Sequence, residues 1–286
     1  MAIILATCTF IGKAQNFNTL YKEGLKFIEA EEFGQAARIL GQALPLADKQ
    51  DKFKALVNLA YSQLMTGEAD KAVESYNKAI EIKPGEKALL FQRANAYMQA
   101  GDFDNAIEDC DSIIGHEPDN RDALLLRAQA YIQKGGYDKA KEGFVHVITL
   151  EPGNMSAKLG LVQVYQKKEM FNEALALIGL LIDEEPQSPT LYIVRSDVER
   201  EMGLYELALL DNEEAIRLCP DNAGYYMLRA ILYEKLGNSK EAGKCRNKAA
   251  SLKTRHSSLH DFQKLSIYSD FIVFDTIANV NTKTTD

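Results

Sequence analysis

The sequence is poor in the residues from which metal and redox sites are built. It contains no tryptophan, four cysteines, four histidines and seven prolines in 286 residues. No two cysteines form a Cys-x-x-Cys pair, which argues against a zinc knuckle or a dithiol redox centre. We expect the thiols to be free and to act as small apolar fillers at Cys8, Cys110, Cys219 and Cys245.

Positive charge is scarce relative to negative charge. The chain has 33 Lys and Arg against 41 Asp and Glu, which gives a net charge of −8. Nucleic-acid binding relies on clustered Lys and Arg, so this balance argues against a nucleic-acid partner. Hydrophobic residues make up 46% and charged residues 26%, which is typical of a folded chain and not of a disordered one.

Motifs that carry catalysis are missing as well. No Gly-x-Gly-x-x-Gly, phosphate-loop or Gly-x-Ser-x-Gly pattern occurs. His256 and His260 stand four residues apart, a spacing that can bind zinc on one helix face, but no third ligand is evident. We therefore expect no enzyme activity, no metal and no cofactor.

The N-terminus begins with a short apolar run, residues 2–11, followed by small residues at Gly12 and Ala14. The run is shorter than the roughly 20 apolar residues that span a membrane. Signal peptidase accepts small residues at this spacing, and the ending before Gln15 resembles Bacteroidetes leaders, although no Lys or Arg precedes the run. We expect residues 1–14 to be a signal peptide and the protein to be periplasmic or secreted. If the segment is retained, the expected compartment is the cytoplasm.

Prolines supply the strongest pattern, because five of the seven recur at an interval of 34 residues. They are Pro84, Pro118, Pro152, Pro186 and Pro220. A constant interval of this length indicates an array of repeats. With each proline counted as position 32, the units are 17–50, 53–86, 87–120, 121–154, 155–188, 189–222 and 223–256.

Other positions of the unit repeat in register. Position 20 is alanine in every unit: Ala36, Ala72, Ala106, Ala140, Ala174, Ala208 and Ala242. Position 8 is small in nearly all, and position 11 is aromatic except at Gln63 and Glu199. Small residues at such positions allow two helix axes to approach closely.

Start and stop signals support two helices in each unit. Glycine, which tolerates the left-handed conformation after a helix, falls between the two helices at Gly67, Gly101, Gly135, Gly203 and Gly237. Residues able to cap the next helix follow each proline at Asn120, Asn154, Ser188 and Asn222.

These positions resemble the tetratricopeptide repeat (TPR) family over about 240 residues. The resemblance implies an all-α fold, a right-handed solenoid of about seven helix pairs, and a non-catalytic scaffold or adaptor that binds another protein. A regulatory subunit that controls a partner enzyme is the alternative function, and a cytosolic scaffold is the alternative if the leader is not cleaved.

In this family the first helices of the units line a concave groove. Mapped here, the groove combines apolar anchors with amides, which suits an extended peptide or a partner helix. The candidate residues are Val57, Asn58, Tyr61, Leu64, Phe91, Asn95, Met98, Leu125, Gln129, Ile132, Leu159 and Gln163. The alternative is that the apolar members pack between neighbouring first helices.

The resemblance also allows one known ligand class to be tested. TPR units that grip the acidic C-termini of heat-shock chaperones present Lys, Asn and Arg at five positions. Here those positions hold Tyr21, Leu25, Asn58, Ala88 and Gln92, so only the central Asn is present. We expect no carboxylate clamp in the first three units.

Four units carry arginine at position 7: Arg93, Arg127, Arg195 and Arg229. Asp109 and Asp211 occupy position 23 of their units, on the facing helix. We expect ion pairs between helices and not a phosphate site. Surface pairs of this kind contribute less than about 1 kcal/mol each.

Beyond residue 256 the repeat pattern stops. Residues 257–286 include the apolar stretch 272–274 and Ile277. Repeat arrays need their last apolar face covered, so this tail is expected either to cap the array or to fold back into the groove.

Overall fold

The structure is a computed structural model that describes residues 2–253, with side chains from Asn16 to Leu252. This part of the chain is all helical and contains no strand. It divides into two compact units, Met1–Lys139 and Ala140–Asp286. Each unit is described by itself below.

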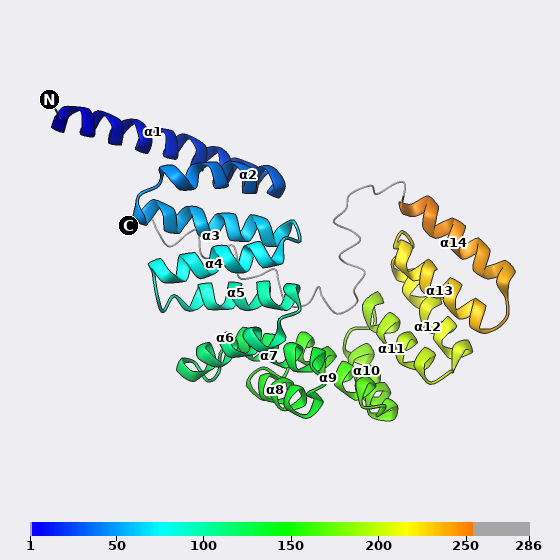
Figure 1. The fold of residues 1–286 in the computed structure, drawn as a ribbon. Helices are drawn as coiled ribbons and strands as arrows, with labels where there is room; N and C mark the ends of the chain where they lie inside the picture. Colours follow the sequence, from blue (N-terminus) through cyan, green and yellow to red (C-terminus); the bar gives the residue numbers. More distant parts are fainter. Residues whose placement is uncertain (1, 254–286) are drawn as a thin grey trace. The chain divides into compact units, whose positions relative to one another are not determined.

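The first unit is a stack of helix hairpins (Figure 1). Its helices are α1 (Ala2–Glu29), α2 (Phe33–Ala43), α3 (Lys49–Met65), α4 (Ala69–Ile82), α5 (Lys87–Ala100), α6 (Phe103–His116) and α7 (Arg121–Gln133), with a short 3-10 helix at Leu44–Leu46. Helix α1 packs on α2, α3 on α4 and α5 on α6, while α2, α4 and α6 each contact the first helix of the next pair.

The second unit repeats this arrangement. Helix α8 (Tyr137–Leu150) begins just before the boundary, and α9 (Met155–Lys167), α10 (Phe171–Glu184), α11 (Pro189–Glu201), α12 (Tyr205–Leu218), α13 (Ala223–Lys235) and α14 (Ser239–Lys253) follow. Helices α9 and α10, α11 and α12, and α13 and α14 form the hairpins, and α10 and α12 contact the next first helix. The chain is thus an all-α array of helix hairpins, as its period predicts.

The turn of each hairpin confirms the glycine prediction. Gly67, Gly101, Gly135, Gly203 and Gly237 all have φ between 75° and 79°. The two hairpins without glycine at this position hold Glu31 and Glu169 there, with φ of 59° and 57°. The left-handed conformation is therefore a property of the turn, and two glutamates adopt it without the freedom of glycine.

Three of the four predicted caps are confirmed. The side chains of Asn120, Asn154 and Asn222 accept hydrogen bonds from the backbone N–H of Ala123, Ala157 and Gly224. Ser188 was expected to do the same, but its side chain makes no capping hydrogen bond. Helix α11 starts with Pro189, whose fixed φ suits a helix start and whose missing N–H needs no acceptor.

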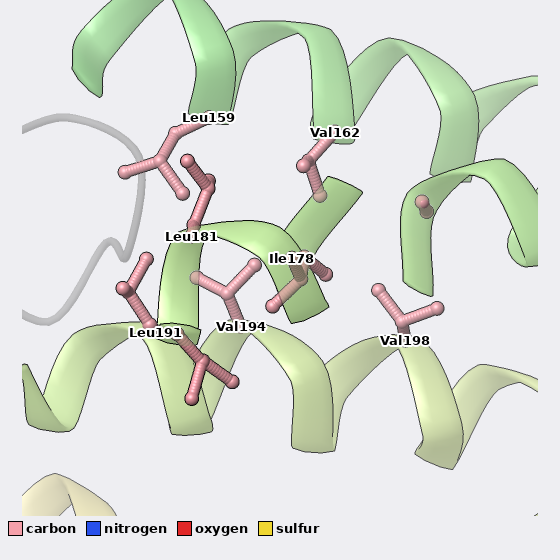
Figure 2. Close-up of a cluster of buried hydrophobic side chains, with 9 residues drawn as sticks. Leu159, Val162, Ile178, Leu181, Leu191, Val194 and Val198 are labelled. Carbon is pink, nitrogen blue, oxygen red and sulfur yellow. The ribbon is translucent and has the colours of Figure 1, made fainter. Parts of the chain in front are cut away.

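The core runs between the helix layers and is built from the predicted small positions. All seven position-20 alanines are fully buried. Figure 2 shows the part of this core between α9, α10 and α11, where Val162, Ile178, Val194 and Val198 meet. The small alanines let the helix axes approach closely. The branched side chains then fill the remaining space between the helices.

Two of the arginine pairs form as predicted, but they are not surface pairs. Arg93 donates to both carboxylate oxygens of Asp109 at 2.9 and 2.6 Å, and Arg195 to both of Asp211 at 2.6 Å. Both carboxylates are buried, because neighbouring helices cover them. Loss of one partner would leave a buried charge without a counter-ion. Breaking one of these pairs should therefore destabilise the fold by more than the value of about 1 kcal/mol expected for a surface pair.

The other two arginines behave differently. Arg127 pairs with Asp111 on the preceding helix and not within its own hairpin. Arg229 faces no acidic residue at position 23, because that position is Cys245. Its guanidinium lies over the Tyr226 ring at 5.2 Å, and its buried Nε has no hydrogen-bond partner. Cys110, Cys219 and Cys245 are free thiols, as expected.

The N-terminal helix is longer than the repeat count predicts. The first unit of the count begins at residue 17, whereas α1 begins at Ala2. The first buried side chain described is Phe17, which stacks on Tyr21 with ring centroids 5.4 Å apart. In the described residues no helix is long and apolar enough to cross a membrane.

Helix α14, the last helix described, has a polar outer face. Helix α14 buries Ala242, Cys245, Ala249 and Leu252, and exposes a run of Lys, Arg, Asn and Ser. The predicted capping or groove-filling segment, residues 257–286, lies outside the described residues, as do His256 and His260. Within residues 2–253 no group of three or more His, Cys, Asp or Glu side chains could hold a metal ion.

Candidate functional site

The twelve candidate groove residues all lie on first helices of the hairpins. Ten are on α3, α5 and α7 of the first unit, and Leu159 and Gln163 are on α9 of the second unit. On α3, α5 and α7, three of the candidates are spaced i, i+4 and i+7, which places them on one helix face. Helix α3 contacts α5, and α5 contacts α7, so equivalent positions on these three helices lie side by side.

Burial separates the candidates into two groups. Leu64, Leu125, Ile132, Leu159 and Gln163 are buried in the described structure. Leu64 and Leu159 belong to hydrophobic clusters that hold the hairpins together. For the four apolar residues of this group the packing alternative fits the structure better than a direct contact with a partner.

The remaining candidates are half-buried. We call them the first-helix face: Val57, Asn58, Tyr61, Phe91, Asn95, Met98 and Gln129. All three candidates on α5 belong to this face. By contrast, one candidate on α3 and two on α7 are buried in the core. Gln92, which is not among the twelve candidates, is also half-buried on α5. The sequence could have identified Gln92, because it occupies the same repeat position as Asn58.

Asn58 is already engaged in the fold. Its Nδ2 donates to the Tyr21 hydroxyl and to the Lys54 carbonyl, each at 3.0 Å. Burial, followed by the charge of Asp51, raises the pKa of Tyr21, and the bond from Asn58 opposes that rise. Both N–H donors of the Asn58 carboxamide are used, so only its oxygen remains as a possible contact for a ligand.

Asn95 and Tyr61 present different chemistry on the same face. Asn95 Nδ2 donates to the Phe91 carbonyl at 2.9 Å within its own helix. A carboxamide has a second N–H and an acceptor oxygen, so Asn95 keeps the capacity to bond a peptide backbone. The Tyr61 ring is held edge-on against Phe33 with centroids 5.6 Å apart. Burial and then the charge of Glu31 raise its pKa, so the hydroxyl stays neutral at physiological pH.

The face carries apolar and amide groups with little charge. Half-buried aromatic and Met side chains lose only part of their solvent on binding, and they gain contact area at low entropic cost. Within this face no nucleophile lies paired with a base.

Comparison with known proteins agrees with this fold. Tetratricopeptide repeat family models match residues 21–87, 97–144 and 223–256, together just over half of the chain. The last match covers the range that the 34-residue interval assigns to the seventh unit. No curated protein sequence matches the chain.

Two solved structures show the same architecture. A tetratricopeptide repeat protein from Parabacteroides merdae is similar over 89% of this chain and 99% of its own, with 23% identity and a TM-score of 0.73. A thermophilic TPR protein from Thermus thermophilus is similar over 64% of this chain and 98% of its own, with 17% identity and a TM-score of 0.52. At these identities the likeness establishes the fold. The repeat interval, the helix hairpins and the family matches agree, and the chain belongs to the tetratricopeptide repeat family.

Proposed function

We propose that the chain is a non-catalytic adaptor that binds an extended peptide or a helix of another protein on the first-helix face. TPR arrays are protein-interaction scaffolds, and the face described above is the part of the first unit best suited to that role. The proposal rests mainly on the partial exposure of the three candidate side chains on α5. Phe91, Asn95 and Met98 all remain half-buried there, although their equivalents on α7 are partly lost to the core.

Physical chemistry favours a segment with apolar side chains over an acidic one. Phe91 and Met98 supply contact area, and Asn95 can bond the backbone of the ligand. The clamp positions for an acidic C-terminus hold no Lys or Arg, and Asn58 is bonded to Tyr21. A partner segment with apolar residues one helical turn apart, or at alternate positions of a strand, would match this face.

The test compares two faces of the same protein. The double variant Phe91→Glu, Met98→Glu places charges on the first-helix face. The control variant Leu207→Glu, Leu210→Glu places two charges on exposed leucines of α12 in the second unit. Affinity capture from the native host, followed by mass spectrometry, should lose a partner with the first variant and keep it with the control. Circular dichroism should show that both variants remain helical.

A photo-crosslinking residue identifies the contact directly. Placed at position 95, it should yield a covalent adduct with the captured partner, and placed at position 210 it should not. The reverse result would move the interaction to the exposed leucines of α12, and the proposed face would be wrong. If the partner is an enzyme whose turnover changes on binding, the adaptor acts as a regulatory subunit.

We also propose that the protein is exported after cleavage between Ala14 and Gln15. Cleavage at this point would leave Phe17, which is buried, in the mature chain. Intact mass of the protein from its native host should show the loss of those residues. A mass that includes them would support the alternative, a cytosolic scaffold.

A further inference from the structure

Two repeats depart from the aromatic residue at position 11, and both place a polar pair between their helices. In the first case Ser75 on α4 donates to the Gln63 side-chain oxygen on α3 at 2.8 Å. In the second case the same two positions hold Glu199 on α11 and Asp211 on α12. The first pair has a donor and an acceptor, whereas the second pair consists of two carboxylates.

Glu199 lies in a poorly solvated place. Only 8% of its surface is exposed, and its Oε2 is buried with no hydrogen-bond partner. An ionised carboxylate has acceptors only, so two ionised carboxylates cannot bond each other. A proton on Glu199 supplies the missing donor and removes a buried charge.

The surroundings of Glu199 come from its own helix and from the helices on either side. On α11 the charged neighbour is Arg195, whose guanidinium already donates two hydrogen bonds to the Asp211 carboxylate. On α12 the charged neighbour is Asp211 itself, which is also buried. The α10 residues packed against α11 include the apolar side chains of Ile178 and Leu181 (Figure 2). One cation therefore faces two carboxylates.

We propose that the α11–α12 hairpin is a proton-dependent lock. With a proton, Glu199 donates a hydrogen bond to Asp211 and holds α11 against α12. When the proton passes to solvent, the ionised Glu199 is repelled by Asp211 and turns out of the interface, so that the hairpin opens locally. The inference concerns the stability of this hairpin and does not depend on which partner the array binds.

The titration of Glu199 places this change near neutral pH. Burial, then the charge of Asp211 and a hydrogen bond with it, raise the pKa of Glu199, and Arg195 opposes the rise, so that the net pKa is about 7. Because the pKa in the folded protein lies above the ordinary value of 4.5, the protonated form favours folding. The stabilisation is complete below about pH 4.5 and is lost as the pH rises through about 7.

Hydrogen–deuterium exchange of the full chain at pH 5.5 and pH 8 tests the lock. After correction for the intrinsic pH dependence of exchange, opening of α11 and α12 in the wild type should increase about tenfold at the higher pH. Glu199→Gln should stay closed at both, because its carboxamide can donate to Asp211 at any pH. Glu213→Gln, on the exposed side of α12, should behave as the wild type.

Two further measurements keep the result unambiguous. Carbon-detected NMR titration of the Glu199 carboxyl should give a pKa well above 4.5. Glu199→Tyr, which restores the aromatic residue of other repeats, should also lose the pH dependence if Glu199→Gln fails to fold. The proposal is overturned if Glu199 titrates near 4.5, or if the pH dependence persists in a folded Glu199 variant.

Discussion

A single residue in each hairpin turn determines how much strain the backbone carries. At repeat position 15 every unit adopts positive φ, and two units hold glutamate there, at Glu31 and Glu169. For a residue with a Cβ this conformation costs roughly 1–2 kcal/mol, whereas glycine adopts it freely. These two turns are therefore the least relaxed in the described array.

We predict that Glu169→Gly stabilises the second unit by about 1 kcal/mol, because it removes the left-handed strain. Gly135→Ala should destabilise the first unit by a similar amount. No atom lies within 4 Å of a Cβ built on Gly135, so the loss would come from its φ alone. Urea unfolding followed by circular dichroism measures both changes.

The control is Glu173→Gly, in the first turn of α10, where glycine has no conformational advantage. It should lower the free energy of unfolding by up to about 1 kcal/mol. If both Glu→Gly variants destabilise, the strain at Glu169 is relieved by contacts of its side chain and the argument from φ is wrong.

At the scale of the element, one helix contact in the second unit is closer than any side chain allows. Gly160 on α9 packs against Phe144 on α8, and a Cβ at Gly160 would lie 2.4 Å from the ring. Glycine is required here by space and not by φ. Position 160 was not singled out in the sequence, because only the facing ring makes it special.

We predict that Gly160→Ala destabilises the second unit by about 1–3 kcal/mol through overpacking. Phe144→Leu in the same chain should recover part of the loss, because the smaller side chain makes room. Gly179→Ala on α10 is the matched control, since no atom lies within 4 Å of its Cβ. That variant should be neutral or stabilising by up to about 1 kcal/mol, as alanine favours helix. Equal effects of the two Gly→Ala changes in thermal unfolding would contradict the packing argument.

Hairpins as elements were predictable because their signals are local. A glycine stop, an asparagine cap and a proline after the second helix act within a few residues of their own position. The cap at Ser188 failed because its local pattern allows a hydrogen bond without requiring it. The end of a helix depends on several weak local interactions, and the helix can form without any one of them.

At the scale of the whole molecule, the last described hairpin has the surface expected of a terminal unit. Helix α14 turns a polar face outward, which repeat arrays require of a terminal unit. We predict that truncation after Lys253 changes the midpoint of thermal unfolding by no more than about 2 °C. Truncation after Asn222, which removes α13 and α14, should lower it more, because it uncovers Ile216 on α12.

Differential scanning calorimetry of the two truncated chains and the full chain gives the comparison. A large loss on truncation after Lys253 would show that residues 254–286 pack against the array and that α14 is not its end. An unchanged midpoint for both truncations would show that the last hairpin is only weakly coupled to the rest.

The sequence by itself determined the repeat, its interval and the two helices of each unit. It also located the small positions and the turn conformation, since these follow from sterics within one hairpin. Asp109 and Asp211 were correctly matched with their arginines because an interval of 16 residues places them on facing helices. The helices, turns and ion pairs depend on residues less than one repeat apart, and the interval shows when the same position is compared in successive repeats.

Only the tertiary structure decided which of these residues are covered. Leu125 and Phe91 occupy the same repeat position, yet one is buried and the other half-exposed. Likewise Glu199 lies beside an acidic residue with an oxygen that no donor reaches, while Gln63 at the same position is satisfied by Ser75. Burial is the sum of contacts from several helices, so it varies between repeats with the same pattern. The physical reason is that solvent exclusion is non-local, whereas the signals that form a helix hairpin are local.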